Sequence, residues 1–180
     1  MKKYKSKLKW GIDCDQVIDD FWNPYVKKFG FPKNDKEITK NVHKKLMYDK
    51  EFWLNLPILH KPNFDLTLYC TKRTSPKVYL KQWLENNDFP IVPIYQVLYQ
   101  KDNKARYIKG KIDVFVDDSI DNFISMNLSG VPCLLMDSPA NQHLGPMLRV
   151  HSLDIEELED VYYLAKELNI FKEFKDYYDN

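Results

Sequence analysis

Two groups of aspartates follow short apolar runs, and their types and spacing could hold a metal ion. The run LKWGI is followed by Asp13 and Asp15, and the run VFV is followed by Asp117 and Asp118. In extended backbone the side chains of residues i and i+2 point the same way, so Asp13 and Asp15 can face one ligand. Crowded carboxylates repel one another unless a cation joins them, and their oxygens favour a hard ion such as Mg²⁺. The pattern therefore predicts a Mg²⁺ site.

The elements that position these acids are indicated by apolar runs that alternate with helix-like stretches. The runs lack polar alternation, as expected for strands covered on both faces. Strands are predicted at 8–13, 64–70, 91–98, 112–118 and 132–137, and helices at about 74–86, 119–130 and 154–169. This order predicts an α/β fold with a central, parallel five-stranded sheet. Because the carboxyl ends of parallel strands meet at one edge, we expect that edge to collect Asp13, Asp15, Thr71, Asp117 and Asp118.

The stretch from 19 to 63 is too long for a simple crossover between the first two strands. It is rich in aromatic residues, and segments 20–29 and 48–56 have helical character. We interpret it as a small helical insertion over the carboxyl end of the sheet, with residues 1–18 and 64–180 forming the core domain. Asp19 and Asp20 are most simply acids at the start of a helix, where the helix dipole favours them.

Composition narrows the class of protein. The 180 residues carry a net charge of +1 and are 44% hydrophobic, which favours a packed core and gives no general argument for nucleic acid or a membrane. Three cysteines without a CxxC pair suit a reducing, cytoplasmic location. We expect neither a membrane span nor a secretory signal, because no apolar run is long enough. The four histidines lack metal-like spacing and are predicted to be non-catalytic.

Four motifs, in order, resemble those of the haloacid dehalogenase-like superfamily. DCDQV (13–17) resembles its first motif, LYCT (68–71) its second, and NKARYIKGKIDVFVDD (103–118) its third and fourth. Three more stretches are similar to the deoxyribonucleotidase-like branch of the 5′-nucleotidases: FWLNLP (52–57), TKR (71–73) and LLMDSPANQ (134–142). The resemblance implies a three-layer Rossmann-like core with a small helical cap inserted after the first strand. Gln16 and Ala140 depart from it, since relatives commonly have glycine and an aromatic residue there.

The resemblance also implies a reaction, the hydrolysis of a phosphate monoester through an aspartyl-phosphate. Asp13 would be the nucleophile, and Asp15 would protonate the leaving group and then deprotonate water. Thr71 and Lys104 would bind the phosphoryl oxygens, with Lys101 as the alternative lysine. Mg²⁺ would be held by Asp13, the backbone carbonyl of Asp15 and Asp117, with Asp118 orienting these groups.

The expected partner is a small phosphate monoester, and the aromatic insertion favours a nucleotide. Lys72 and Arg73 are candidate substrate-binding residues, and Phe21, Trp22 and Tyr48 are candidate platforms for a base. Two alternatives stay open: a phosphatase for sugar phosphates or nucleic-acid termini, and a non-catalytic module that only binds phosphate. Retention of both Asp13 and Asp15 weighs against the non-catalytic module.

Overall fold

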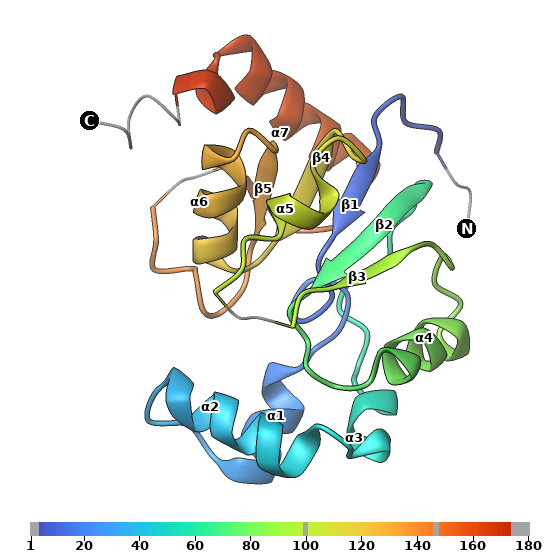
Figure 1. The fold of residues 1–180 in the computed structure, drawn as a ribbon. Helices are drawn as coiled ribbons and strands as arrows, with labels where there is room; N and C mark the ends of the chain where they lie inside the picture. Colours follow the sequence, from blue (N-terminus) through green and yellow to red (C-terminus); the bar gives the residue numbers. More distant parts are fainter. Residues whose placement is uncertain (1–3, 99–100, 146–147, 174–180) are drawn as a thin grey trace.

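A computed structural model describes residues 4–98, 101–145 and 148–173, and it contains one sheet of six parallel strands (Figure 1). The spatial order is β3-β2-β1-β4-β5-β6. The bounds are β1 (Trp10–Ile12), β2 (Leu66–Thr71), β3 (Ile94–Gln96), β4 (Val114–Asp117), β5 (Cys133–Met136) and β6 (Arg149–Val150). The predicted α/β class and parallel sheet are confirmed. The predicted number of five strands is wrong, because β6 adds an edge that is only two residues long and leaves no sequence pattern.

Helices cover both faces of the sheet. The first face packs against α4 (Lys77–Asn86) and α7 (Ile155–Glu167), and the second against α5 (Ala105–Ile108) and α6 (Ile120–Leu128). Successive strand residues serve alternate faces, as a pleated strand requires: Val114 and Val116 belong to the first core and Phe115 to the second. Among the described residues, none of the helices has the length and apolar character needed to cross a membrane.

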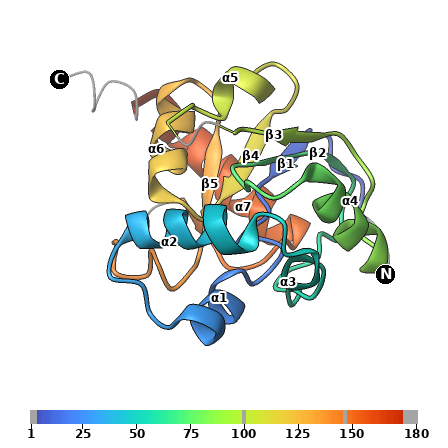
Figure 2. The same cartoon turned by 60° about the horizontal axis from the view of Figure 1, so that its bottom comes forward.

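The insertion between β1 and β2, residues 19–63, is here called the helical segment. It holds α1 (Trp22–Phe29), α2 (Asp35–Asn41), the π-helix η1 (Val42–Leu46) and α3 (Lys50–Leu54). Helices were predicted near α1 and α3, whereas α2 and η1 were not predicted. Figures 1 and 2 show these helices gathered at one end of the sheet. Aromatic residues of the helical segment pack together, for example Phe21 against Trp53 with ring centroids 5.8 Å apart.

The two ends of the helical segment lie side by side. The Asp20 amide donates to the Pro57 carbonyl and the Leu59 amide to the Ile18 carbonyl, each at 2.9 Å. These bonds form a short antiparallel pairing at the base of the segment, so the chain leaves the sheet and returns to it at one place.

Gly11 in the central strand β1 allows side chains of the second core to approach the backbone closely. A methyl group at this position would lie 2.9 Å from both Ile112 Cδ1 and Phe115 Cδ2, and 3.0 Å from Leu68 Cδ1. These distances are shorter than van der Waals contact, so any larger residue requires its neighbours to move.

We therefore expect Gly11→Ala to lower the free energy of unfolding by about 1–3 kcal/mol, the usual cost of overpacking a core. Gly145→Ala is the matched control, because a methyl group there meets nothing within 4 Å. Urea denaturation of both variants measures the difference. Equal stability of the two variants would contradict the close packing around Gly11.

Candidate active site

The acids lie where the order of strands reverses direction in the sheet. The chain runs outward from β1 through β2 to β3, then returns to place β4 on the other side of β1. Asp13 follows β1, Thr71 ends β2 and Asp117 ends β4, so three neighbouring strands contribute a polar residue at their carboxyl ends. The Asp13 amide donates to the Val116 carbonyl at 2.9 Å and extends the pairing of β1 with β4. Ligands of open α/β sheets bind at this kind of switch point.

Lys104 is buried between two of these acids. Its Nζ lies 2.7 Å from Asp117 Oδ2 and 2.8 Å from Asp13 Oδ2, and the side chain has no exposed surface. Burial alone would lower the pKa of Lys104, but the adjacent Asp117 and Asp13 carboxylates outweigh it and raise that pKa. Lys104 therefore remains a cation at neutral pH. Lys101, the alternative lysine, is exposed and makes no such contact in the described structure.

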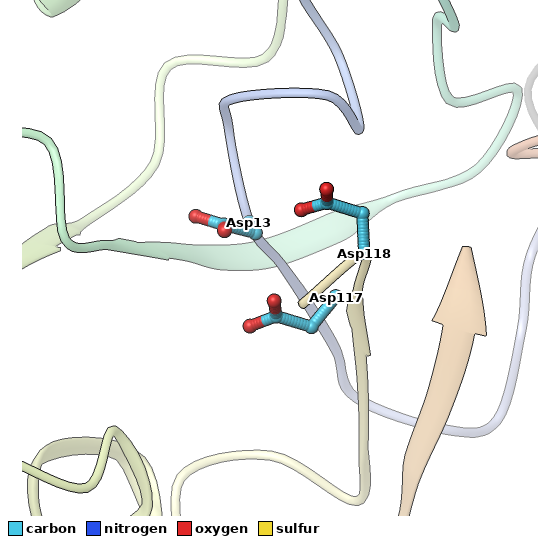
Figure 3. A group of neighbouring side chains, drawn as sticks. All are labelled: Asp13, Asp117 and Asp118. Carbon is cyan, nitrogen blue, oxygen red and sulfur yellow. The ribbon is translucent and has the colours of Figure 1, made fainter. Parts of the chain in front are cut away.

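Asp13, Asp117 and Asp118 form a carboxylate cluster (Figure 3). One oxygen from each lies within 4.8 Å of the others. Burial raises the pKa of Asp117 to about 6, against the opposing effect of Lys104. Burial also raises the pKa of Asp118 well above its ordinary value, and Asp117 and Asp13 add to this effect. Each shift reflects the cost of holding negative charges together away from water.

This cluster fits a divalent cation. When ionised, the three carboxylates carry three negative charges and Lys104 supplies one positive charge, which leaves two uncompensated. Asp13 Oδ1 is buried and has no hydrogen-bond partner among the described residues. Asp117 Oδ1 is held by the Ser119 amide at 3.0 Å and by Asn122 Nδ2 at 3.1 Å. A hard ion with oxygen ligands would satisfy both the orphaned oxygen and the charge.

The backbone that carries Asp118 is supported from the turn after β5. Asn141 Nδ2 donates to the carbonyls of Asp118 and Met136, each at 2.8 Å. Arg149 of β6 donates to the Asn141 side chain and backbone. This turn contains the SPANQ part of the LLMDSPANQ stretch, and its asparagine, not Ala140, makes these contacts.

Asp15 faces a different partner from Asp13. Its Oδ1 accepts hydrogen bonds from Arg73 Nε at 3.0 Å and Nη2 at 2.6 Å. Arg73 Nη2 also pairs with Asp19 Oδ2, and both side chains are buried. The interpretation of Asp19 as a helix-terminal acid is therefore wrong, because burial beside Arg73 replaces exposure at a helix end. Asp20 does lie just before the start of α1, and its Oδ1 accepts from the Asn23 amide at 3.0 Å.

Gln16 lies in the turn that presents Asp15. Its φ is +60°, a left-handed conformation that glycine adopts most easily. The Gln16 amide donates to the Asp19 carbonyl at 2.8 Å, and its side chain donates to Asp20 at 3.2 Å. The departure at this position thus keeps the turn, and side-chain bonding offsets part of the strain.

A cavity of about 250 Å³ lies beside Asp13 and Asp15. Residues from the sheet edge and from the helical segment line it: Asp13, Asp15, Phe21, Ile38, Thr39, Val42, His43, Trp53, Lys72, Arg73 and Thr74. A wider polar hollow of about 670 Å³ adjoins it and shares Asp13, Thr39 and Lys72. Burial lowers the pKa of Lys72, and nearby Lys104 adds to the effect.

The structure separates the three aromatic candidates. Phe21 lines the cavity, Trp22 lines a separate small hollow with Gln16, Pro139 and Ala140, and Tyr48 is 76% exposed and lines neither. Trp53 and His43 do line the cavity, although the sequence analysis did not select them. Trp53 lies in the FWLNLP motif, which was the available signal. No sequence signal pointed to His43, because the helix η1 that carries it was not predicted.

Neither a search with models of known protein families nor a search of curated proteins finds a match to this chain.

Removal of Lys104 should expose the repulsion within the cluster. We expect Lys104→Met to lower the free energy of unfolding by about 3–5 kcal/mol, because it leaves buried carboxylates without their cation. Lys101→Met, the control, should change stability by less than about 0.5 kcal/mol. The measurement is urea denaturation at pH 7 in EDTA. Similar losses in both variants would argue against a buried Lys104.

Proposed function

We propose that this protein is a Mg²⁺-dependent phosphomonoesterase of the haloacid dehalogenase-like type that acts on nucleoside monophosphates. The observation that carries the proposal is the Asp13–Lys104–Asp117 arrangement at the carboxyl ends of β1 and β4. The four motifs of the resemblance supply these residues in order, and Thr71 ends the neighbouring strand β2. Three buried, unpaired cysteines suit the cytoplasmic location that we also propose.

Asp13 is the proposed nucleophile. Its buried Oδ1, which has no protein partner, is the oxygen that Mg²⁺ would take, so Oδ2, which Lys104 contacts, is the oxygen that would attack phosphorus. A bond forms from Oδ2 to phosphorus as the bond from phosphorus to the ester oxygen breaks. Lys104 stays charged and offsets the negative charge that meets between carboxylate and phosphate. Bound Mg²⁺, held by Asp13, Asp117 and a backbone carbonyl at Asp15, would supply further positive charge beside the phosphoryl oxygens.

Asp15 is the proposed acid and base. It gives a proton to the leaving alkoxide, then accepts one from the water that attacks the aspartyl-phosphate and releases inorganic phosphate. Thr71 can assist at the phosphoryl group. Its Oγ1 accepts from the Arg73 amide at 3.1 Å, which leaves the hydroxyl proton to donate to a phosphoryl oxygen. The helical segment would act as the cap that shields this chemistry from bulk water.

The division of labour is tested with 4-nitrophenyl phosphate and an alkyl phosphate. Asp13→Asn should abolish turnover of both and prevent covalent labelling by phosphate. Asp15→Asn should slow the alkyl phosphate by about 10²–10⁴-fold, since its leaving group needs a proton. Addition of EDTA should abolish turnover by the wild-type protein. Mg²⁺ should raise the melting temperature of that protein, because it binds the folded state. Near-normal rates in Asp13→Asn, or full activity in EDTA, would contradict the proposal.

The preference for nucleotides rests on the Phe21–Trp53 wall of the cavity. One stacked base contributes about 1–3 kcal/mol, or roughly 5–150-fold in kcat/KM over a sugar phosphate. Phe21→Leu should reduce this ratio, whereas Phe31→Leu should not, because Phe31 is 81% exposed and lies outside the cavity. The ratio cancels any loss of folded protein common to both substrates.

The substrate panel contains ribo- and deoxyribonucleotides with 3′ or 5′ phosphates, sugar phosphates and phosphorylated oligonucleotides. Equal rates across the panel would leave a general phosphatase. A preference for oligonucleotide ends would favour an end-processing enzyme. Absence of turnover for every compound would favour the non-catalytic module.

A further inference from the structure

Arg73 joins three parts of the molecule. It lies in the loop after β2, its guanidinium donates to Asp15 in the turn after β1, and it pairs with Asp19 at the base of the helical segment. The guanidinium carbon also lies 5.0 Å from the centre of the Trp53 ring in α3. One side chain thus connects the sheet, the proposed acid and the helical segment.

This group of charges is buried at a considerable cost. The exposed fraction is 1% for the Arg73 side chain and 0% for Asp19, and Asp19 Oδ1 and Arg73 Nη1 have no hydrogen-bond partner among the described residues. Replacement of a buried ion pair by apolar residues is often neutral or stabilising. Stability alone is therefore a weak reason for these residues, and a role in geometry accounts for them better.

The loop that carries Arg73 is itself fixed to the sheet. The Arg73 amide donates to Thr71 Oγ1, and Gln96 Nε2 of β3 donates to the carbonyls of Arg73 and Ser75, each at 2.6 Å. The guanidinium therefore extends from a rigid base toward two parts of the chain, the Asp15 turn and the helical segment.

We propose that Arg73 is a positioning residue that sets the carboxylate of Asp15 for proton transfer and links its position to that of the helical segment; this inference rests on the proposed function. Both hydrogen bonds from Arg73 end on Asp15 Oδ1, which fixes the side-chain rotamer and leaves Oδ2 to hold the proton. Displacement of Asp19 or Trp53 would move the guanidinium and, through it, Asp15.

The catalytic part of the test compares 4-nitrophenyl phosphate, whose leaving group needs no proton, with a nucleoside monophosphate. Arg73→Gln should lower kcat/KM for the nucleotide about 10–100-fold more than for the aryl phosphate, because a misplaced acid fails only where a proton is needed. In an Asp15→Asn background, Arg73→Gln should change this ratio no further. The control is Arg106→Gln, since the Arg106 side chain is exposed and forms an ion pair with Asp102, not with Asp15 or Asp19.

The second part is hydrogen exchange, which needs no activity. Arg73→Gln should speed exchange about tenfold or more at the amides of residues 16–20 and at Trp53, while the amides of α6 keep their wild-type rates. Because Arg73→Gln leaves Asp19 buried without a cation, the double variant Arg73→Gln/Asp19→Asn removes both charges and serves if the single variant does not fold.

The kinetic and exchange experiments distinguish failure of the positioning role of Arg73 from failure of the proposed function. An unchanged substrate ratio in an active Arg73 variant, or faster exchange confined to the loop at 71–75, overturns the positioning role. Failure of the wild-type protein to release phosphate from any substrate overturns the proposed function, and the exchange result then decides by itself whether Arg73 links Asp15 to the helical segment.

Discussion

The contact on which the site depends is the buried Lys104 ammonium between the carboxylates of Asp13 and Asp117. Without it, β1 and β4 would end in adjacent buried negative charges, and the central pair of the sheet would be destabilised where it must be most regular. A single ammonium cannot balance the cluster once Asp118 is included. The remaining deficit is what the proposed Mg²⁺ would offset, and the same repulsion between carboxylates limits the stability of the fold.

The described structure contains two networks of charge at this edge, and each places one cation between two carboxylates. In the first, Lys104 contacts Asp13 and Asp117; in the second, Arg73 contacts Asp15 and Asp19. Lysine offers a compact charge that fits between two oxygens. The planar guanidinium of arginine can instead hold two separate segments of the chain at fixed angles. The two neighbouring aspartates of DCD are thus placed in different environments, which suits a nucleophile beside an acid and base.

Sequence reasoning located the positions that topology controls. Asp13, Thr71 and Asp117 could be placed because strand ends in a parallel sheet must converge, whatever the details of packing. The partners of Arg73 could not be predicted from the sequence, because they depend on how the helical segment packs against the sheet. Asp19 also has an equally good local explanation as a helix-terminal acid. The same limit applies to the aromatic residues: Tyr48 and Trp53 are close in sequence, yet only Trp53 faces the cavity. The strand β6 was too short to give any pattern.

The paired ends of the helical segment have a consequence for how such a protein can change over evolutionary time. Two backbone hydrogen bonds join the chain where it leaves the sheet, near Ile18, to the place where it returns, near Leu59. The residues between them therefore form a loop whose two ends are held together. Doubling such a loop costs only about 0.6 kcal/mol of closure entropy. Under the proposed function, the segment that would contact the substrate can therefore lengthen, shorten or be exchanged at little cost, while the proposed catalytic acids stay fixed at the strand ends. Novel specificity is expected to arise by replacement of a module and not by redesign of the sheet.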